Sequence, residues 1–165
     1  MPRQHALELV PHDAGDAAIR RDWRTLRVAG LASQLDHPAA TNTPHVTVLA
    51  LPEVRPETEA LAARLLGPLL PVRVRTAGLA VLGGQKVTVA RLLDVPEFLS
   101  RAVLDLRAGS EGERHPGWLP HVTLARRMPR AQVQLAIDVL GYDDVELTLG
   151  SLRRWDPERH EVRGL

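Results

Sequence analysis

The residues best suited to chemistry in this chain belong to a tetrapeptide, Pro-His-Val-Thr, that occurs twice. Its histidines are His45 and His121, and its threonines are Thr47 and Thr123. In an extended strand successive side chains point to opposite faces, so each histidine shares a face with the threonine that lies roughly 6.6 Å further on. Imidazole transfers protons near neutral pH, and a hydroxyl donates and accepts hydrogen bonds. Two such strands predict a site for an oxyanion such as phosphate.

The two copies of the tetrapeptide are placed alike in the chain. Their spacing is close to half of the 165 residues, and each copy opens a short apolar run, followed by a Pro-containing break and a helix-like segment. This pattern predicts an internal duplication in which each half supplies one strand and one helix to a pseudo-symmetric pair. The alternative is that each histidine only packs or caps at a strand end, but that role does not explain the threonine in the same phase.

Two imidazoles suit displacement at phosphorus because one can accept a proton while the other donates one near neutral pH. One histidine would deprotonate the incoming water or hydroxyl, and the other would protonate the departing ribose oxygen from the opposite side of the phosphorus. The threonine hydroxyls would bind nonbridging oxygens, so the site would need neither a metal nor another cofactor. Which histidine is the base stays open at this level.

A guanidinium can offset the charge that develops on the phosphate, and Arg126 is the candidate because it follows His121 by five residues. An odd offset in a regular strand places Arg126 on the face opposite His121, so a bend or bulge would be needed to bring it into the site. Arg127 is in phase with His121 and is the alternative on strand geometry alone.

Length and composition limit the class of protein. The 165 residues, 44% of them hydrophobic, suit one compact domain over residues 1–165 made of two interleaved lobes. A formal net charge of +1 favours a small or terminal phosphate over long nucleic acid as the partner. Cysteine is absent, which excludes thiolate chemistry and favours a reducing compartment. No secretory segment or membrane-spanning run is evident, so we expect a soluble, cytoplasmic monomer with no membrane partner.

Hydrophobic periodicity predicts helices interleaved with strands. Gly83-Gly84 and Asp156-Pro157 are turn signals that predict two antiparallel hairpins, and these exclude a doubly wound parallel sheet in favour of an α+β fold. The predicted helices span residues 16–29, 57–70, 95–106 and 129–140, and the predicted strands span 5–10, 45–51, 72–82, 87–93, 119–126, 145–155 and 161–163. A charged, Gly-containing loop is expected over residues 108–117.

These motifs resemble those of the two-histidine phosphoesterase superfamily, in particular its 2′,5′ RNA ligase and RNA 2′,3′-cyclic phosphodiesterase group. The family signature is His-x-Thr-x with a hydrophobic last residue, present twice at half-chain spacing. Residues 45–48 read His-Val-Thr-Val and residues 121–124 read His-Val-Thr-Leu, so both match it completely. Residues 118–120 and the arginine at position 126 also resemble the second motif of the family, which favours Arg126 over Arg127.

The resemblance spans nearly the whole chain and implies a fold and an activity. The fold would be bilobal α+β, with two pseudo-symmetric antiparallel sheets, flanking helices and a central cleft. The activity would be metal-independent hydrolysis of 2′,3′-cyclic phosphates, in RNA ends or nucleotides, to 2′-phosphates, with His45 and His121 as catalytic residues and with a possible reversible 2′,5′ RNA ligase reaction. Some relatives act on linear 2′,5′-linked nucleotides and others on ADP-ribose cyclic phosphate.

Aromatic residues are scarce, at 3% of the chain, so few side chains can stack on a base. Trp118, three residues before His121, is the candidate for base stacking, and packing in the core is its alternative role. His115 could reach the mouth of the cleft from its loop, or it is a solvated loop residue. The remaining histidines form no spaced pair.

Two other classes of protein fit the same residues. A zinc enzyme could use His45 and His121 as ligands, but no carboxylate adjoins either motif at a repeated position and the paired threonines would be unexplained. A non-catalytic nucleotide or RNA-end binding module could keep the phosphate pocket without turnover. The complete motifs favour the enzyme.

Overall fold

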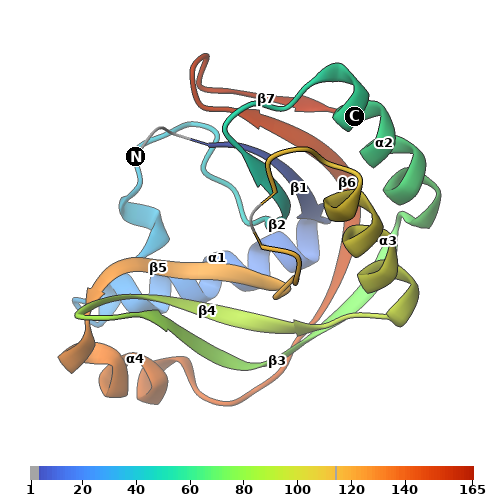
Figure 1. Ribbon diagram of the computed structural model, residues 1–165. Helices are drawn as coiled ribbons and strands as arrows, with labels where there is room; N and C mark the ends of the chain where they lie inside the picture. Colours follow the sequence, from blue (N-terminus) through green and yellow to red (C-terminus); the bar gives the residue numbers. More distant parts are fainter. Residues whose placement is uncertain (1–3, 114) are drawn as a thin grey trace.

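The computed structural model describes residues 4–113 and 115–165 of the chain (Figure 1). The predicted loop over 108–117 therefore includes one residue, 114, that lies outside the described part. The α-helices are α1 (Asp13–Val28), α2 (Pro56–Leu66), α3 (Glu97–Ala108) and α4 (Val133–Leu140), with short 3₁₀ turns at Gln34–Asp36, Gly67–Leu69 and Arg130–Gln132. The strands are β1 (His5–Pro11), β2 (Val46–Leu51), β3 (Val72–Gly83), β4 (Lys86–Asp94), β5 (His121–Pro129), β6 (Glu146–Asp156) and β7 (Glu161–Gly164).

The strands form one antiparallel sheet in the order β2-β1-β6-β3-β4-β5, with β7 also paired to β6. The long strand β6 joins the two halves, because residues 146–149 pair with β3 and residues 149–155 pair with β1. Figure 1 shows β6 curving from the half that holds β1, β2 and β7 to the half that holds β3, β4 and β5. The α+β class is confirmed, whereas the two sheets expected are two halves of one continuous sheet.

Two pairs of helices pack on the sheet, α1 with α4 and α2 with α3. Helix α1 packs on α4 and β5, whereas α2 packs on α3 and β6, and α3 also packs on β2. The buried residues of α1 include Ile19, Trp23 and Leu26, which recur at the three- and four-residue spacing of one helix face. Burying each such side chain stabilises the fold by about 1.5–3 kcal/mol.

Several element boundaries differ from the prediction for local reasons. Helix α1 begins at Asp13, three residues early, with Asp13 and Asp16 in its first turn, where carboxylates interact favourably with the helix dipole. Helix α2 ends at Leu66 instead of residue 70, because Pro68 has no N–H to continue the helix and the chain tightens into a 3₁₀ turn. Strand β5 extends to Pro129, so α4 begins only at Val133.

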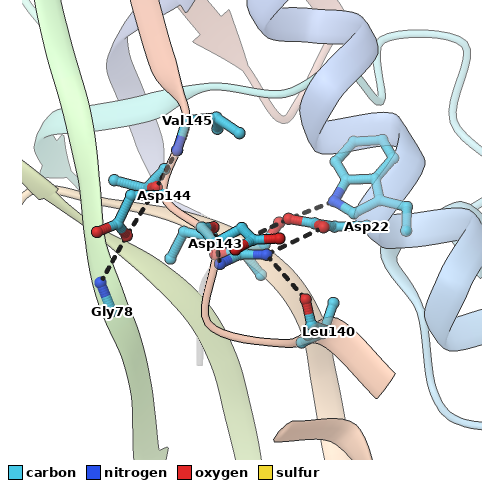
Figure 2. Close-up of polar contacts among 10 residues, drawn as sticks. Asp22, Gly78, Leu140, Asp143, Asp144 and Val145 are labelled. Carbon is cyan, nitrogen blue, oxygen red and sulfur yellow. Dashed lines mark hydrogen bonds and ion pairs between the residues drawn. The ribbon is translucent and has the colours of Figure 1, made fainter. Parts of the chain in front are cut away.

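A buried arginine fastens the second half of the sheet to its helices. Arg91 of β4 donates from Nε and Nη2 to the two carboxylate oxygens of Asp22 in α1, at 2.8 and 3.2 Å. Its Nη1 donates to the Asp143 carbonyl at 3.2 Å, and its Nη2 also donates to the Leu140 carbonyl at 3.4 Å. Its three partners, Asp22, Asp143 and Leu140, lie close together in Figure 2. Arg91 is buried, and its charge is compensated by Asp22, whose side chain is 18% exposed, and by two carbonyl groups. A buried charge is tolerated when it is paired and hydrogen bonded in this way.

The segment that follows α4 is also fixed to β3. Asp144 accepts hydrogen bonds from the Thr76 hydroxyl at 3.2 Å and from the Gly78 N–H at 3.4 Å, and the Val145 N–H donates to the Thr76 hydroxyl at 2.8 Å (Figure 2). Gly78 has a φ of +90°, which a residue with a side chain rarely adopts, and it lies in a bulge of β3. These contacts hold the start of β6 in place.

Candidate active site

The two motif strands present their histidine and threonine as the alternation rule predicts. At the start of β2, His45 and Thr47 are half-buried while Val46 is fully buried. In β5, His121 and Thr123 are half-buried in the same way. The valines therefore anchor each strand in the core, and the polar pair of each motif faces out of it.

Both motif strands carry a bulge just after the threonine. In β2, Val48 and Leu49 are consecutive and both fully buried, and in β5 the same holds for Leu124 and Ala125. The pairing register shifts at both places, from Thr47–Glu8 to Leu49–Leu7 and from Thr123–Ala90 to Ala125–Val89. Each bulge turns the residue five positions after the histidine back to the face of that histidine.

The bulge that Arg126 required is therefore present, at Leu124 and Ala125, and a second bulge follows it in β5. Arg126 and Arg127 both lie opposite Thr88, between the paired core residues Ala125 and Met128, and both are exposed. Arg127 takes a φ of +58°, which is the backbone irregularity that accommodates the extra residue. The corresponding position after His45 is occupied by an alanine, Ala50, so only the second copy supplies a cation.

The motif strands stand at opposite ends of the strand order but lie side by side, because the sheet curves back on itself. The Trp118 indole N–H donates to the Thr47 carbonyl at 2.9 Å, and Arg107 donates from Nη1 to the Val48 carbonyl at 2.9 Å. Helix α3, through Arg107, and the loop before β5, through Trp118, thus satisfy carbonyl groups that edge strand β2 leaves without a strand partner. A second indole, Trp23 of α1, donates to the Thr123 carbonyl at 3.0 Å.

Both imidazoles are held in the same way. Nδ1 of His45 lies 2.8 Å from the Thr43 carbonyl, and Nδ1 of His121 lies 2.7 Å from the Leu119 carbonyl, in each case two residues before the histidine. A carbonyl oxygen only accepts hydrogen bonds, so each Nδ1 must carry the proton. This contact fixes the ring orientation and leaves Nε2 of each ring for proton transfer.

A buried carboxylate that sequence reasoning missed lies beside His45. Glu8 of β1 is only 4% exposed, and its Oε1 is 3.5 Å from Nε2 of His45. Its other oxygen, Oε2, accepts a hydrogen bond from Nε of Arg153 at 2.7 Å, and Nη1 of Arg153 donates to the Thr43 hydroxyl at 2.6 Å. The signal in the sequence was a single charge between two leucines in an otherwise apolar strand.

The surroundings of His45 favour its neutral form. Burial lowers the pKa of His45 and outweighs the Glu8 carboxylate and the Thr43 carbonyl, both of which raise it. The guanidiniums of Arg153 and Arg126 lower the pKa further. Because Arg126 comes from β5, this effect means that the Arg126 guanidinium lies within electrostatic range of the first motif.

The other predicted residues have different surroundings. Trp118 is partly buried against the core, and its indole N–H donates to the Thr47 carbonyl of β2, so it has a structural contact. Its stacking on a base stays a prediction. His115 is exposed in its loop. Within residues 4–113 and 115–165 one group of three potential metal ligands is close enough to share an ion: His5, Asp156 and Glu158. It contains neither motif histidine.

None of the helices in the described part of the chain is both long and apolar enough to cross a membrane.

The fold is similar to that of several solved structures, one of which is described as a phosphoesterase and is 18% identical, with a TM-score of 0.55 over 99% of this chain and 94% of that one. E. coli LigT complexed with 3′-AMP is 18% identical, with a TM-score of 0.57 over 99% of this chain and 94% of that one. TT0787 of Thermus thermophilus is 21% identical, with a TM-score of 0.59 over 98% and 93%. Kluyveromyces marxianus Usb1 is 13% identical, with a TM-score of 0.57 over 99% and 98%. At these identities the likeness establishes the fold.

The family follows from the sequence. The model of the 2′-5′ RNA ligase superfamily matches residues 15–161, which include both motifs. No curated protein matches the chain. The chain belongs to the 2′-5′ RNA ligase superfamily, which comprises phosphoesterases and ligases.

Proposed function

We propose that the protein is a metal-independent phosphodiesterase that hydrolyses 2′,3′-cyclic phosphates, of RNA ends or nucleotides, to 2′-phosphates. The observation that carries this proposal is the equivalent arrangement of the two motifs on adjoining edge strands. Each imidazole is bound through Nδ1 to the carbonyl two residues earlier, and each shares a face with a threonine. Two proton-transfer groups and two hydroxyl donors then surround one phosphate.

The reaction follows from these groups. Water attacks the phosphorus while one Nε2 accepts its proton, the bond between phosphorus and O3′ breaks, and the other imidazolium donates a proton to O3′. Thr47 and Thr123 donate hydrogen bonds to the nonbridging oxygens, and Arg126 offsets the charge that develops on them. A ribose 5′-hydroxyl in place of water gives a 2′,5′ linkage by the same proton transfers, which is the ligase reaction.

The solved relatives support nucleotides as the class of ligand. LigT has been solved with 3′-AMP, ATP and NADP⁺, and Usb1 with uridine monophosphate. The half-buried Trp118 lies beside the first motif through its bond to Thr47 and is the one aromatic side chain that we propose for contact with a base.

The proposal is tested by incubating the purified protein with EDTA and four substrate classes: RNA ends with a 2′,3′-cyclic phosphate, small 2′,3′-cyclic nucleotides, 2′,5′-linked oligonucleotides and ADP-ribose cyclic phosphate. Formation of a 2′-phosphate from a cyclic phosphate in EDTA is the expected result. Activity that EDTA abolishes would indicate a metal enzyme. Binding of the same nucleotides without turnover would indicate a binding module.

A further inference from the structure

The four residues around the first motif form a closed ring of contacts. His45 donates through Nδ1 to the Thr43 carbonyl, Arg153 joins the Thr43 hydroxyl to Glu8, and Glu8 returns to Nε2 of His45. Arg153 and Glu8 are 11% and 6% exposed in their side chains, so the ion pair is shielded from water. In this setting the Arg153 guanidinium is the hydrogen-bonded counterion of Glu8, and it fixes the carboxylate so that Oε1 faces Nε2 of His45.

At the corresponding cross-strand positions beside the second motif, all within the described residues, there is no carboxylate. Across the sheet, Thr47 pairs with Glu8 and Glu8 with Arg153, whereas Thr123 pairs with Ala90 and Ala90 with Ala80. The two alanines stand where the first half has the ion pair. The two imidazoles are therefore held alike but face different charges.

A carboxylate beside a phosphate site has a definite electrostatic consequence. It repels the nonbridging oxygens, which are negatively charged, and it attracts an O–H group or an imidazolium N–H. The side of the phosphate next to Glu8 therefore suits the neutral attacking O–H group. Once His45 has taken the proton, the imidazolium faces the carboxylate, and this attraction strengthens as the transition state forms.

We propose that Glu8, held by Arg153, is a positioning residue that makes His45 the proton acceptor for the attacking oxygen and leaves His121 to protonate the departing one. This assignment rests on the proposed phosphodiesterase function. The proton of the attacking water passes to Nε2 of His45 as the new P–O bond forms. The P–O3′ bond breaks, and O3′ receives the proton from Nε2 of His121.

The groups that face His45 fix the direction of each test. Glu8 faces it from β1, Arg153 from β6 and Arg126 from β5, and only Glu8 favours the protonated ring through its charge. Glu8→Gln should lower the pKa of His45, and with it the acidic limb of kcat/KM, by about one pH unit. Arg153→Gln should move both in the opposite direction, because His45 becomes the counterion of Glu8.

The experiment measures the pH dependence of kcat/KM and titrates the His45 ring by NMR in the wild type and in both variants. Glu8→Gln should also reduce turnover at pH 7 roughly tenfold. Asp22→Asn is the matched control, because it too removes a shielded carboxylate from an arginine, Arg91, but on the side of the second motif, where Arg91 pairs with Val122. Neither residue is among the groups that act on His45. Asp22→Asn should lower stability and leave the acidic limb unchanged.

Two results would contradict the role of Glu8: Glu8→Gln turns over substrate with the acidic limb of kcat/KM unchanged, or its NMR titration shows a changed pKa for the His121 ring alone. Neither result would contradict the proposed phosphodiesterase activity. If Glu8→Gln does not fold, Arg153→Gln decides, since an unchanged His45 titration in that variant contradicts the proposal equally. Failure of the wild type to turn over any of the four substrate classes would overturn the proposed function, and the assignment of the base with it.

Discussion

The first half of the sheet, with β2, β1 and the end of β6, and the second half, with β5, β4 and β3, hold the same motif in different surroundings. Both motif strands bulge after the threonine and bind the histidine Nδ1 to a backbone carbonyl. Beside the first motif lies the ion pair of Glu8 and Arg153, and at the end of the second lies Arg126. The backbone therefore repeats the geometry of the motif in both halves, whereas the charged side chains beside the two motifs differ.

The largest expected effect tests what the two halves share. His45→Ala and His121→Ala should each reduce turnover by about 10²- to 10⁴-fold, because each removes one of two proton transfers. Thermal unfolding checks that both variants keep the fold. A variant of either histidine that retains more than a tenth of wild-type turnover would break the proposed equivalence of the motifs.

The next effect tests the cation that only the second half supplies. Arg126→Gln should lower kcat/KM by roughly 10²-fold, because one charge-bearing donor to the transition state is lost. Arg127→Gln is the control, since it removes the neighbouring exposed arginine of the same bulge and should change kcat/KM less than threefold. Equal losses in the two variants, or the larger loss in Arg127→Gln, would contradict the assignment.

The two indoles that bind motif carbonyls allow a smaller, structural comparison. Trp23 is fully buried, so Trp23→Phe should lower the free energy of unfolding by about 2–3 kcal/mol through lost packing and one lost hydrogen bond. Trp118→Phe removes the same kind of bond from a half-buried ring and should cost about 1 kcal/mol. Urea titration measures both, and a larger cost for Trp118→Phe would show that the loop matters more than the α1 contact.

The smallest effect concerns pH. A base must be neutral to act, and burial holds the pKa of His45 below its usual 6.5. If His45 is the base, kcat/KM should be maintained as pH falls from 7 through 6.5 and should decline only through the lowered pKa. The pH profile of the wild type measures this directly. An acidic limb above 6.5 would assign the base to another group.

The sequence predicted the part of the site that depends on local rules. Strand alternation placed His45 with Thr47 and His121 with Thr123, and the offset of Arg126 required the irregularity that the bulge in β5 supplies. The α+β class followed from the hairpin turns and the spacing of apolar residues.

The parts that depend on distant contacts were not predictable from local patterns. Glu8 and Arg153 are neighbours only because β1 lies between β2 and β6, a pairing that no local pattern specifies. The joining of the two halves into one sheet depends likewise on β6 changing partners along its length. The contact between Trp118 and β2 requires the curvature that brings the two edge strands together.

Whether the two motifs form one phosphate site is decided by titrating the wild-type protein with a nucleoside 2′-monophosphate and following the imidazole resonances of both His45 and His121 by NMR. If they form one site, as we propose, both resonances shift with a single common Kd. A shift of only one histidine, separate Kd values for the two, or no shift of either would contradict that proposal.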